Sequence, residues 1–216
     1  MNTLSDSDEL LLAMLKHVPF DGWSWSALKS GIADLNKDPD DIEFIFSQGP
    51  IDAARHCGIY FDRIMSETLK DTSIDVMPVR EKIKFIIETR LELILPFKES
   101  IRCLLSFLSL PGNKSVALQM TFKAVDEMWY LAGDQSTDYN YYSKRALLAG
   151  VYGSTILYWL SDNDDEFRST RKFLERRIND VIMIPRIKRA LTDKLGSFSK
   201  IIKGFKKINL LKNIVH

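Results

Sequence analysis

Apolar residues recur at intervals of three and four along nearly the whole chain, and strict alternation of apolar and polar residues is scarce. This periodicity predicts amphipathic helices rather than strands. Pro39, Pro50 and Pro78 lie near expected helix starts, where the missing N–H of proline is harmless, and Pro111-Gly112 indicates a turn. The sequence therefore predicts an all-α protein with about ten helices, at residues 5–17, 24–35, 39–47, 50–71, 77–95, 97–109, 114–132, 138–161, 165–184 and 196–213.

The first three expected helices are short and fill fewer than fifty residues, and longer helices follow. The segment "DELLLAMLKHVPFDGWSWSALKSGIADL" followed by "DPDDIEFIFS" resembles the helix-turn-helix head of TetR-type regulators, in which a helical ligand-binding body follows the head. We therefore expect a degenerate helix-turn-helix head at residues 1–60, a helical ligand-binding and dimerisation body at residues 61–190, and a basic amphipathic helix at residues 191–216.

A TetR-like head would ordinarily predict a DNA-binding repressor, which is the alternative function for this chain. The expected recognition helix, however, carries Asp38, Asp40, Asp41 and Glu43, and residues 38–54 contain no Lys or Arg. Because DNA affinity depends on cations that neutralise phosphates, this helix would repel a duplex. The sequence therefore predicts that the head does not bind nucleic acid.

The overall composition is that of a folded protein, but the charges are unevenly distributed. The 216 residues are 45% hydrophobic and 27% charged, with a formal net charge of +1. Residues 1–60 carry a net charge of −6, with ten acids and four Lys/Arg, whereas residues 194–216 carry six lysines and no acid. No apolar run reaches the length of a membrane span, the acidic N-terminus predicts no signal or transit peptide, and two cysteines favour a reducing compartment.

Catalytic and metal-binding motifs are absent from the sequence. His17, His56 and His216 are scattered, and His56 and Cys57 are adjacent in the chain, so that they do not share a helix face. Phosphate-binding loops, dinucleotide fingerprints and nucleophile elbows are missing. Asp126 and Glu127 suit a salt bridge or cap as well as acid/base chemistry. The sequence thus favours a binding protein without cofactor or metal over an enzyme.

The helix expected at residues 138–161 combines small residues with bulky apolar ones. Gly150 and Gly153 are unfavourable inside a helix, by up to about 1 kcal/mol each relative to alanine, and therefore require a reason. Close helix packing, for example across a homodimer, is one reason, and space for a long apolar ligand is the other. Met120 and Phe122 offer further wall material on the preceding helix, and the candidate lipid-binding residues are Met128, Trp129, Leu147, Leu148, Gly150, Val151, Gly153 and Ile156.

The last segment, "GSFSKIIKGFKKINLLKNIVH", separates apolar and cationic residues on a helical wheel. Its apolar face, which includes Ile208, and its lysine face are typical of an interfacial helix on an anionic membrane. A helix docked on its own domain is the alternative, although such a helix has no need of six lysines. The candidate membrane-binding residues are Phe198, Lys200, Ile201, Ile202, Lys203, Phe205, Lys206 and Lys207.

The segment "VDEMWYLAGDQSTDYNYYSKRALLAGVYGSTILYWLSD", residues 125–162, places a polar, tyrosine-rich patch before the apolar helix. It resembles the core signature of the lipid-binding accessory family of ubiquinone (coenzyme Q) biosynthesis. The resemblance extends to "VPFDGWSWSAL" at 18–28, "DVMPVREKIKFIIETRLELILP" at 75–96 and "FLERRINDV" at 173–181. Where eukaryotic members often carry an aromatic pair that begins with Trp, this chain has Tyr141-Tyr142.

The resemblance implies a function for each part of the chain. Members of the family are TetR-like in fold, bind isoprenoid lipids, meet the membrane through their last helix and assist the di-iron hydroxylase of demethoxyubiquinone. By resemblance, this chain is a non-enzymatic homodimer that binds a polyprenylated quinone precursor or a phospholipid at the cytoplasmic face of a bacterial inner membrane, or at the matrix face in mitochondria. The implied contacts with the hydroxylase are Asp134, Tyr141, Tyr142, Lys144 and Arg145.

Overall fold

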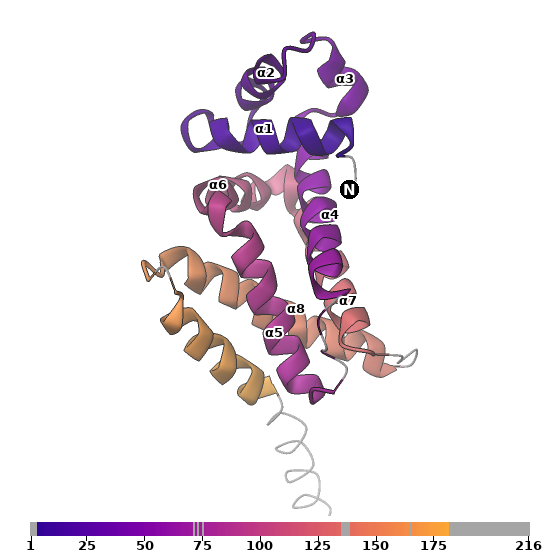
Figure 1. Ribbon diagram of the computed structural model, residues 1–216, viewed down its shortest axis with the longest axis vertical. Coiled ribbons are helices and arrows are strands. Elements are labelled where there is room, and N and C mark those ends of the chain that lie inside the picture. Colours follow the sequence, from indigo (N-terminus) through magenta and orange to yellow (C-terminus); the bar gives the residue numbers. More distant parts are fainter. Residues whose placement is uncertain are drawn as a thin grey trace, which may run out of the picture. The chain divides into compact units, whose positions relative to one another are not determined.

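The structure is a computed structural model, and every regular element in the part that it describes is helical (Figure 1). It describes residues 4–70, 72, 74, 76–134, 139–164 and 166–181, with the side chains of residues 139 and 140 left aside. Two short 3₁₀ turns, η1 (Leu95–Phe97) and η2 (Pro111–Asn113), flank α6, and residues 168–181 form a further helix after α8. The labelled helices are α1 (Asp6–Asp21), α2 (Trp25–Asp34), α3 (Asp41–Ile45), α4 (Pro50–Lys70), α5 (Val79–Ile94), α6 (Lys98–Ser109), α7 (Lys114–Leu131) and α8 (Tyr139–Ser161).

These elements confirm the all-α prediction. Nine of the ten predicted helices fall wholly or largely within the described residues, and a helix is present in each, with most of the described ends within two or three residues of the prediction. The third is shorter than predicted, because α3 contains only five residues. The tenth, at residues 196–213, lies outside the described residues, as do all eight candidate membrane-binding residues.

The chain divides into two compact units, residues 1–174 and 175–216. The first unit contains the predicted head and most of the predicted body, and residue 60, the predicted boundary between them, lies inside α4. The described part of the second unit is the end of the last helix, where Arg177 Nη2 lies 2.7 Å from Asp180 Oδ2.

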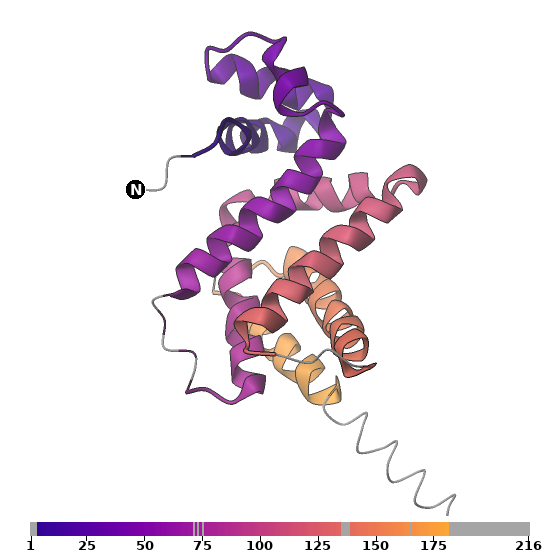
Figure 2. The same cartoon turned by 90° about the vertical axis from the view of Figure 1, so that its right-hand side faces the viewer.

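Helices α1, α2 and α3 form the head of the first unit. Figures 1 and 2 show α2 and α3 on one side of α1 and the helices of the body on the other side. The Trp23 indole donates a buried hydrogen bond to the Pro50 carbonyl, with Nε1 and O 2.8 Å apart. Gly49 has a φ of 58°, and a Cβ atom there would lie 2.1 Å from the Trp25 ring. A tight glycine turn therefore allows the head to close against the start of α4.

Helix α1 continues through Pro19 to Asp21, four residues beyond the predicted end at residue 17. Proline has no N–H, so the carbonyl of Leu15, four residues earlier, receives no helical hydrogen bond from it. The buried Ser100 hydroxyl of α6 donates to that carbonyl instead, with Oγ and O 2.6 Å apart. A bond from a distant helix thus satisfies the carbonyl that the proline leaves free, and it ties α1 to the body.

Asp8 ties the other end of α1 to α4. Asp8 and Ser5 form a capping box, and the Asp8 carboxylate also accepts from His56 Nε2 at 2.9 Å and Arg63 Nη2 at 2.8 Å. Burial alone would raise the pKa of Asp8, but the bonds from Arg63, the Ser5 backbone and His56 lower it to about 2. The His56 side chain therefore has a structural role.

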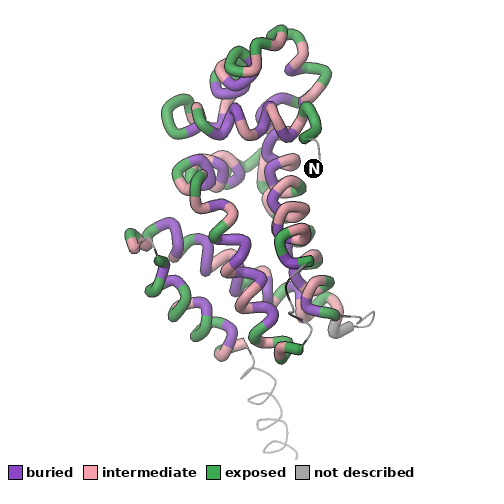
Figure 3. Tube along the Cα trace, in the orientation of Figure 1, coloured by how far each residue is buried: buried purple, intermediate pink, exposed green. Residues whose placement is uncertain are grey.

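The body consists of α4 to α8, whose long helices enclose the core. Helix α4 packs against α5 and α7, and α7 packs against α8. Figure 3 shows buried residues alternating mainly with intermediate ones along α4 and α5, as expected for helices that bury one face. Among the described residues, the largest fully buried side chain is Trp159 of α8, with an exposed fraction of 0%. These five helices position the candidate site.

Candidate functional site

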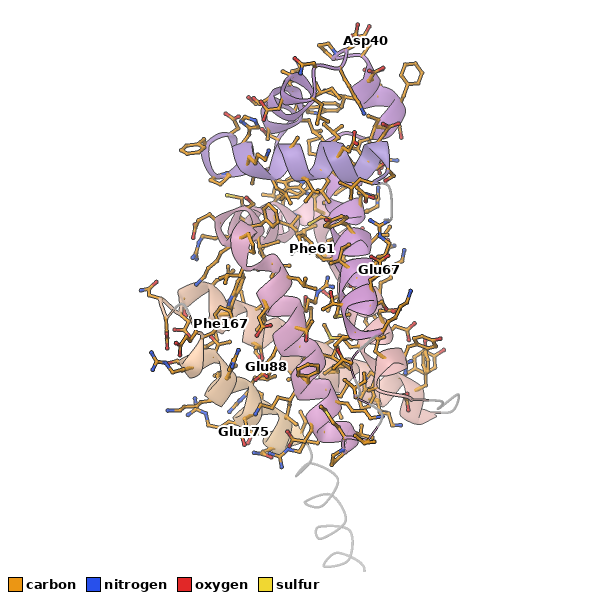
Figure 4. The ribbon with its side chains drawn as sticks, in the orientation of Figure 1. Asp40, Phe61, Glu67, Glu88, Phe167 and Glu175 are labelled. Carbon is orange, nitrogen blue, oxygen red and sulfur yellow. The ribbon has the colours of Figure 1, made fainter. Side chains whose placement is uncertain are left out.

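A cavity of about 660 Å³ opens between helices α4 to α8. This volume lies within the range of small-molecule pockets in proteins. Figure 4 shows Phe61, one of the lining residues, on α4. Helix α6 contributes an apolar stripe to the wall, because Ile101, Leu104, Leu105 and Leu108 follow the spacing of one helix face.

Two of the eight candidate lipid-binding residues, Gly153 and Ile156 of α8, line this cavity, and so does Met120 of α7. The other six, listed at the end of this paragraph, do not line it. Several of them are instead packed in the core, with exposed fractions of 0% to 5% for Met128, Leu148 and Val151. The six residues away from the cavity are Met128, Trp129, Leu147, Leu148, Gly150 and Val151.

The glycines of α8 are not needed for close packing within the described part of the chain. Apart from its chain neighbours and the backbone of its own helix, a Cβ atom added to Gly150 or to Gly153 would have no described atom within 4 Å. Gly153 faces the cavity, whereas Gly150 lies outside its lining. The space beside Gly153 therefore fits the ligand interpretation, and neither Gly150 nor Gly153 is closely packed against the residues that the structure describes.

Sequence reasoning missed the contributions of α4, α5 and α6 to the cavity. Their lining residues include Cys57, Gly58, Phe61, Arg90 and Ile94 together with the α6 stripe. The stripe on α6 was visible as a pattern, but it does not differ from an ordinary core face. Arg90 lies between Glu88 and Glu92 in the segment "IIETRLELILP", so that the sequence alone does not mark it as buried.

Arg90 links three helices beside the cavity. Its Nε atom donates to the Tyr152 hydroxyl of α8 at 2.6 Å, and its Nη1 atom lies 2.5 Å from Asp62 Oδ1 of α4. The second contact is an ion pair rather than a well-oriented hydrogen bond, since neither atom meets hydrogen-bond geometry with any partner in the described structure. Arg90, Tyr152 and Cys57 line the cavity, so that they form a polar section of an apolar wall.

The ionisable groups of this section keep their protons. Burial raises the pKa of the Cys57 thiol to about 12 and also raises the pKa of Tyr152, although Arg90 opposes both shifts. Burial works against the charge of Arg90, but Tyr152 and Asp62 outweigh it and raise the pKa of Arg90. A thiol and a phenol that stay protonated are hydrogen-bond donors rather than nucleophiles.

The predicted partner-binding residues gather where α7 ends and α8 begins, and they are largely paired with one another. Arg145 Nε lies 2.5 Å from Asp126 Oδ1, and Arg145 Nη1 lies 3.3 Å from Asp134 Oδ2. Lys144 Nζ lies 2.6 Å from Asp134 Oδ1. Asp126 therefore forms a salt bridge, which was one of the roles that the sequence suggested for it. Arg145 is only 5% exposed, and its guanidinium is already paired with residues of the same chain.

The tyrosines give this surface its aromatic character. Tyr142 and Tyr130 are 68% and 72% exposed, whereas the Tyr141 hydroxyl donates to Asp126 Oδ1 at 3.1 Å. The Tyr141 and Tyr142 rings meet edge to face, with their centroids 5.1 Å apart. We call Tyr130, Asp134, Tyr141, Tyr142, Lys144 and Arg145 the tyrosine patch. Tyr130 was not among the predicted contacts, although it lies in the quoted signature.

The head presents acids to solvent. Asp38, Asp40 and Glu43 are exposed, and Figure 4 shows Asp40 at the outer end of the head. Beside them Phe44 of α3 is 88% exposed. The described residues contain no group of three metal-ligating side chains and no helix both long and apolar enough to cross a membrane.

Known proteins resemble this chain over most of its length. Residues 115–185 match the COQ9 family. The chain is 34% identical to the mitochondrial ubiquinone biosynthesis protein COQ9 of Rattus norvegicus, over 80% of this chain and 57% of the rat protein. The corresponding protein of Homo sapiens is 33% identical, over 80% of this chain and 56% of the human protein. The chain thus spans a little over half the length of these relatives.

The fold also matches a solved structure. A TetR transcriptional regulator from Nitrosomonas europaea superposes with a TM-score of 0.66 and 18% identity, over 83% of this chain and 99% of the regulator. A likeness at this identity concerns the fold alone. Together these matches confirm the resemblance read from the sequence: the chain is a relative of the COQ9 proteins of ubiquinone biosynthesis, and its fold is TetR-like.

Proposed function

We propose that this chain is a non-enzymatic lipid-binding protein of ubiquinone biosynthesis. It binds polyprenylated quinone intermediates at the membrane and presents them to the di-iron hydroxylase of demethoxyubiquinone. The observation that carries the proposal is the cavity of about 660 Å³ with a largely apolar wall between α4 and α8. The names of the rat and human relatives support the pathway.

The physical need for such a protein follows from the tail of the ligand. Burying each CH₂ of a polyprenyl tail gains about 0.8 kcal/mol, so that the intermediate does not enter water unaided. An apolar cavity at the membrane surface replaces the contacts that the tail loses when it leaves the bilayer. Such a role needs no catalytic group, which agrees with the protonated Cys57 and Tyr152 side chains of the cavity wall.

The tyrosine patch is the proposed contact with the hydroxylase. Exposed tyrosines within a frame of paired charges are typical of interface anchors, because their rings bury much area at little cost in entropy. Tyr142 and Tyr130 are the anchors by their exposure. The charged residues around them form ion pairs with one another, Asp134 with both Lys144 and Arg145.

The contact with the membrane is assigned to the basic segment at residues 191–216. This segment lies outside the described residues, so that the proposal rests on its sequence alone. Its lysines and its apolar residues suit the surface of an anionic membrane, at the cytoplasmic face of a bacterial inner membrane or the matrix face of a mitochondrial one. The homodimer expected from the sequence belongs to the same proposal.

Two glycine substitutions on α8 test the cavity with a matched control. Gly153→Leu places a side chain beside the cavity, whereas Gly150→Leu adds the same atoms on the same helix outside the cavity lining. Both changes improve helix propensity, so that both variants stay folded. We expect lipid extraction and mass spectrometry of the purified proteins to find co-purified isoprenoid lipid in the wild type and in Gly150→Leu, and several-fold less in Gly153→Leu.

The same measurement can contradict the proposal. Unchanged lipid content in a folded Gly153→Leu variant would exclude the cavity as the lipid site.

A DNA gel shift at low salt tests the repressor alternative, because a repressor must bind a duplex. We expect no shift, since the exposed carboxylates of Asp38, Asp40 and Glu43 repel phosphate.

A further inference from the structure

The wall of the cavity presents hydrogen-bond donors, whereas the carboxylate that pairs with Arg90 lies outside the lining. Arg90, Tyr152 and Cys57 line the cavity, whereas Asp62, the anionic partner of Arg90, does not. An arginine carries N–H donors only, and a protonated thiol is a weak donor. The Tyr152 hydroxyl can donate as well as accept, so that this section of the wall favours a ligand atom that is an acceptor.

Tyr152 is the donor best placed for a ligand. Its hydroxyl oxygen accepts from Arg90 Nε at 2.6 Å, and no bond from its own hydrogen is found to any described residue. The residue is only 6% exposed and lines the cavity, so that this hydrogen has no bulk water to bond with. An unused donor in an apolar wall costs free energy until a ligand or an ordered water accepts from it. The charged Arg90 also polarises the hydroxyl and makes it a stronger donor.

The other polar side chains of the cavity either donate to backbone carbonyls or are exposed to solvent. Ser109 Oγ donates to the Ser106 carbonyl at 2.7 Å, and Thr121 Oγ1 donates to the Ala117 carbonyl at 2.9 Å. Lys114 is exposed. Within the described lining, the Arg90 and Tyr152 section is therefore the buried place for a polar ligand group.

The charge balance of this section selects between ligand classes. The Arg90 guanidinium lies 2.5 Å from Asp62 Oδ1. Burial raises the pKa of Asp62, and the charge of Arg90 opposes this shift. As an ion pair, the two side chains add little net charge to the wall. A carboxylate or phosphate would lose its hydration here without gaining an uncompensated cation. A neutral acceptor, such as a carbonyl oxygen, loses far less on entering an apolar cavity.

We infer that Tyr152, held in place by Arg90, is the head-group donor of the cavity, and that the ligand is an amphiphile whose polar end carries a neutral carbonyl oxygen. The hydrocarbon part lies along the apolar wall that α6 provides. This inference rests on the proposed function, and it adds the residue and the chemistry by which a carbonyl-bearing ring is preferred over a plain hydrocarbon.

If Arg90 and Tyr152 had only a structural role, a different result would be expected for ligand binding. Arg90 also joins α4, α5 and α8, so that changes at Arg90 or Asp62 alter stability for reasons unrelated to any ligand. A structural role requires no discrimination between two ligands of equal size. The decisive measurement is therefore a ratio of affinities for two matched ligands, combined with a substitution that keeps the ring of Tyr152.

The test uses decylubiquinone and the matching decyl dimethoxytoluene, which lacks the two carbonyl oxygens. Their affinities for the full chain are measured by displacement of a fluorescent lipid. We expect the wild type to bind the quinone at least tenfold more tightly than the toluene analogue. Tyr152→Phe should weaken quinone binding at least fivefold and leave binding of the analogue within twofold. Tyr158→Phe is the control, because Tyr158 lies on the same helix, stacks on Phe173 and does not line the cavity.

The outcomes separate this inference from the proposed function. Equal affinity of the wild type for both ligands, or unchanged quinone affinity in a folded Tyr152→Phe variant, overturns the head-group site but leaves a lipid-binding cavity in place. Tighter binding of 4-decylbenzoate than of the quinone overturns the neutral-carbonyl assignment in favour of an anion. If no ligand displaces the lipid from the wild type, the proposed function itself fails. If Tyr152→Phe does not fold, the ratio of the two ligands on the wild type decides.

Discussion

Arg145 and Tyr142 lie three residues apart on α8, yet the structure gives them different roles. The sequence placed both in one contact surface. Arg145 is 5% exposed and pairs with Asp126 and Asp134, whereas Tyr142 is 68% exposed. Residue type and spacing do not distinguish a buried cation from an exposed aromatic residue, because burial depends on where the end of α7 meets α8.

Substitutions at these two positions should therefore have opposite effects. We expect Tyr142→Ala to weaken binding of the hydroxylase about tenfold or more, as for an interface anchor, with an unchanged melting temperature. Arg145→Ala should instead destabilise the fold by about 3 kcal/mol, because it leaves the buried Asp134 carboxylate without one of its partners. Pull-down with the hydroxylase and thermal unfolding measure the two effects. A Tyr142→Ala variant that unfolds, or that binds as the wild type does, would contradict the assignment.

Asp8 makes the stability of the head dependent on pH. Its pKa is about 2 in the folded protein and 3.8 as an ordinary carboxyl group, so that the unfolded state binds the proton more tightly. This stabilisation is fully present above the ordinary pKa and is lost as the pH falls through the folded pKa. The difference corresponds to about 2 kcal/mol.

We expect the free energy of unfolding of the wild type to fall as the pH decreases from about 4 to about 2, the window between the two pKa values. Asp8→Asn should be less stable at neutral pH by about 2 kcal/mol and should show less of this pH dependence. Urea unfolding at several pH values measures both. Asp6→Asn is the control, because the Asp6 side chain lies in the same turn and is 74% exposed. Equal pH profiles for Asp8→Asn and the wild type would contradict this account.

At the level of helices, the sequence predicted most of the fold. Periodicity together with prolines and glycines predicted the nine described helices, since these signals are local. The end of α1 was predicted four residues too early. The helix passes Pro19, and the carbonyl that this proline leaves free accepts from Ser100, which is 81 positions away from Pro19 in the chain. A local rule cannot anticipate a hydrogen bond from another helix.

Ser100→Ala tests this explanation. The change leaves the Leu15 carbonyl without its donor, and a buried unpaired carbonyl costs about 1–3 kcal/mol. We expect a lower free energy of unfolding by that amount, measured by urea titration. Ser106→Ala on the same helix is the control, because its exposed hydroxyl donates to the Arg102 carbonyl and its loss should change stability by less than about 0.5 kcal/mol. Equal stability of the two variants would mean that α1 does not depend on Ser100.

The cavity was predicted only in part, for a related reason. The small residues of α8 indicated free space, and Gly153 and Ile156 do line the cavity. Met128, Leu148 and Val151 share their apolar character but lie in the core. Whether an apolar face of α8 is buried or lines the cavity depends on how the neighbouring helices pack against it. This packing cannot be predicted from the sequence of α8 alone. Arg90 was visible in the sequence, but its partners lie on two other helices.

Across the whole chain, charge separates the parts that meet different surroundings. The head carries exposed acids such as Asp38 and Asp40, whereas the segment at residues 194–216 contains six lysines and no acidic residue. The acidic head disfavours DNA and anionic membranes alike. The proposed orientation at the membrane therefore places the basic segment toward the lipid, and the attachment depends on that segment alone.

Each lysine near an anionic surface contributes about 1 kcal/mol, and each inserted Phe or Ile side chain contributes about 1–2 kcal/mol. Since neither contribution alone holds the protein firmly, we expect flotation with cardiolipin-containing liposomes, with less on neutral liposomes or at high salt. Ile202→Asp combined with Phe205→Asp should abolish flotation, because two carboxylates would enter the acyl region. The matched control is Phe20→Asp with Phe44→Asp, which changes two exposed aromatic residues of the head, 90% and 88% exposed, and should leave flotation nearly intact. Equal flotation of both double variants would show that the basic segment does not hold the protein at the membrane.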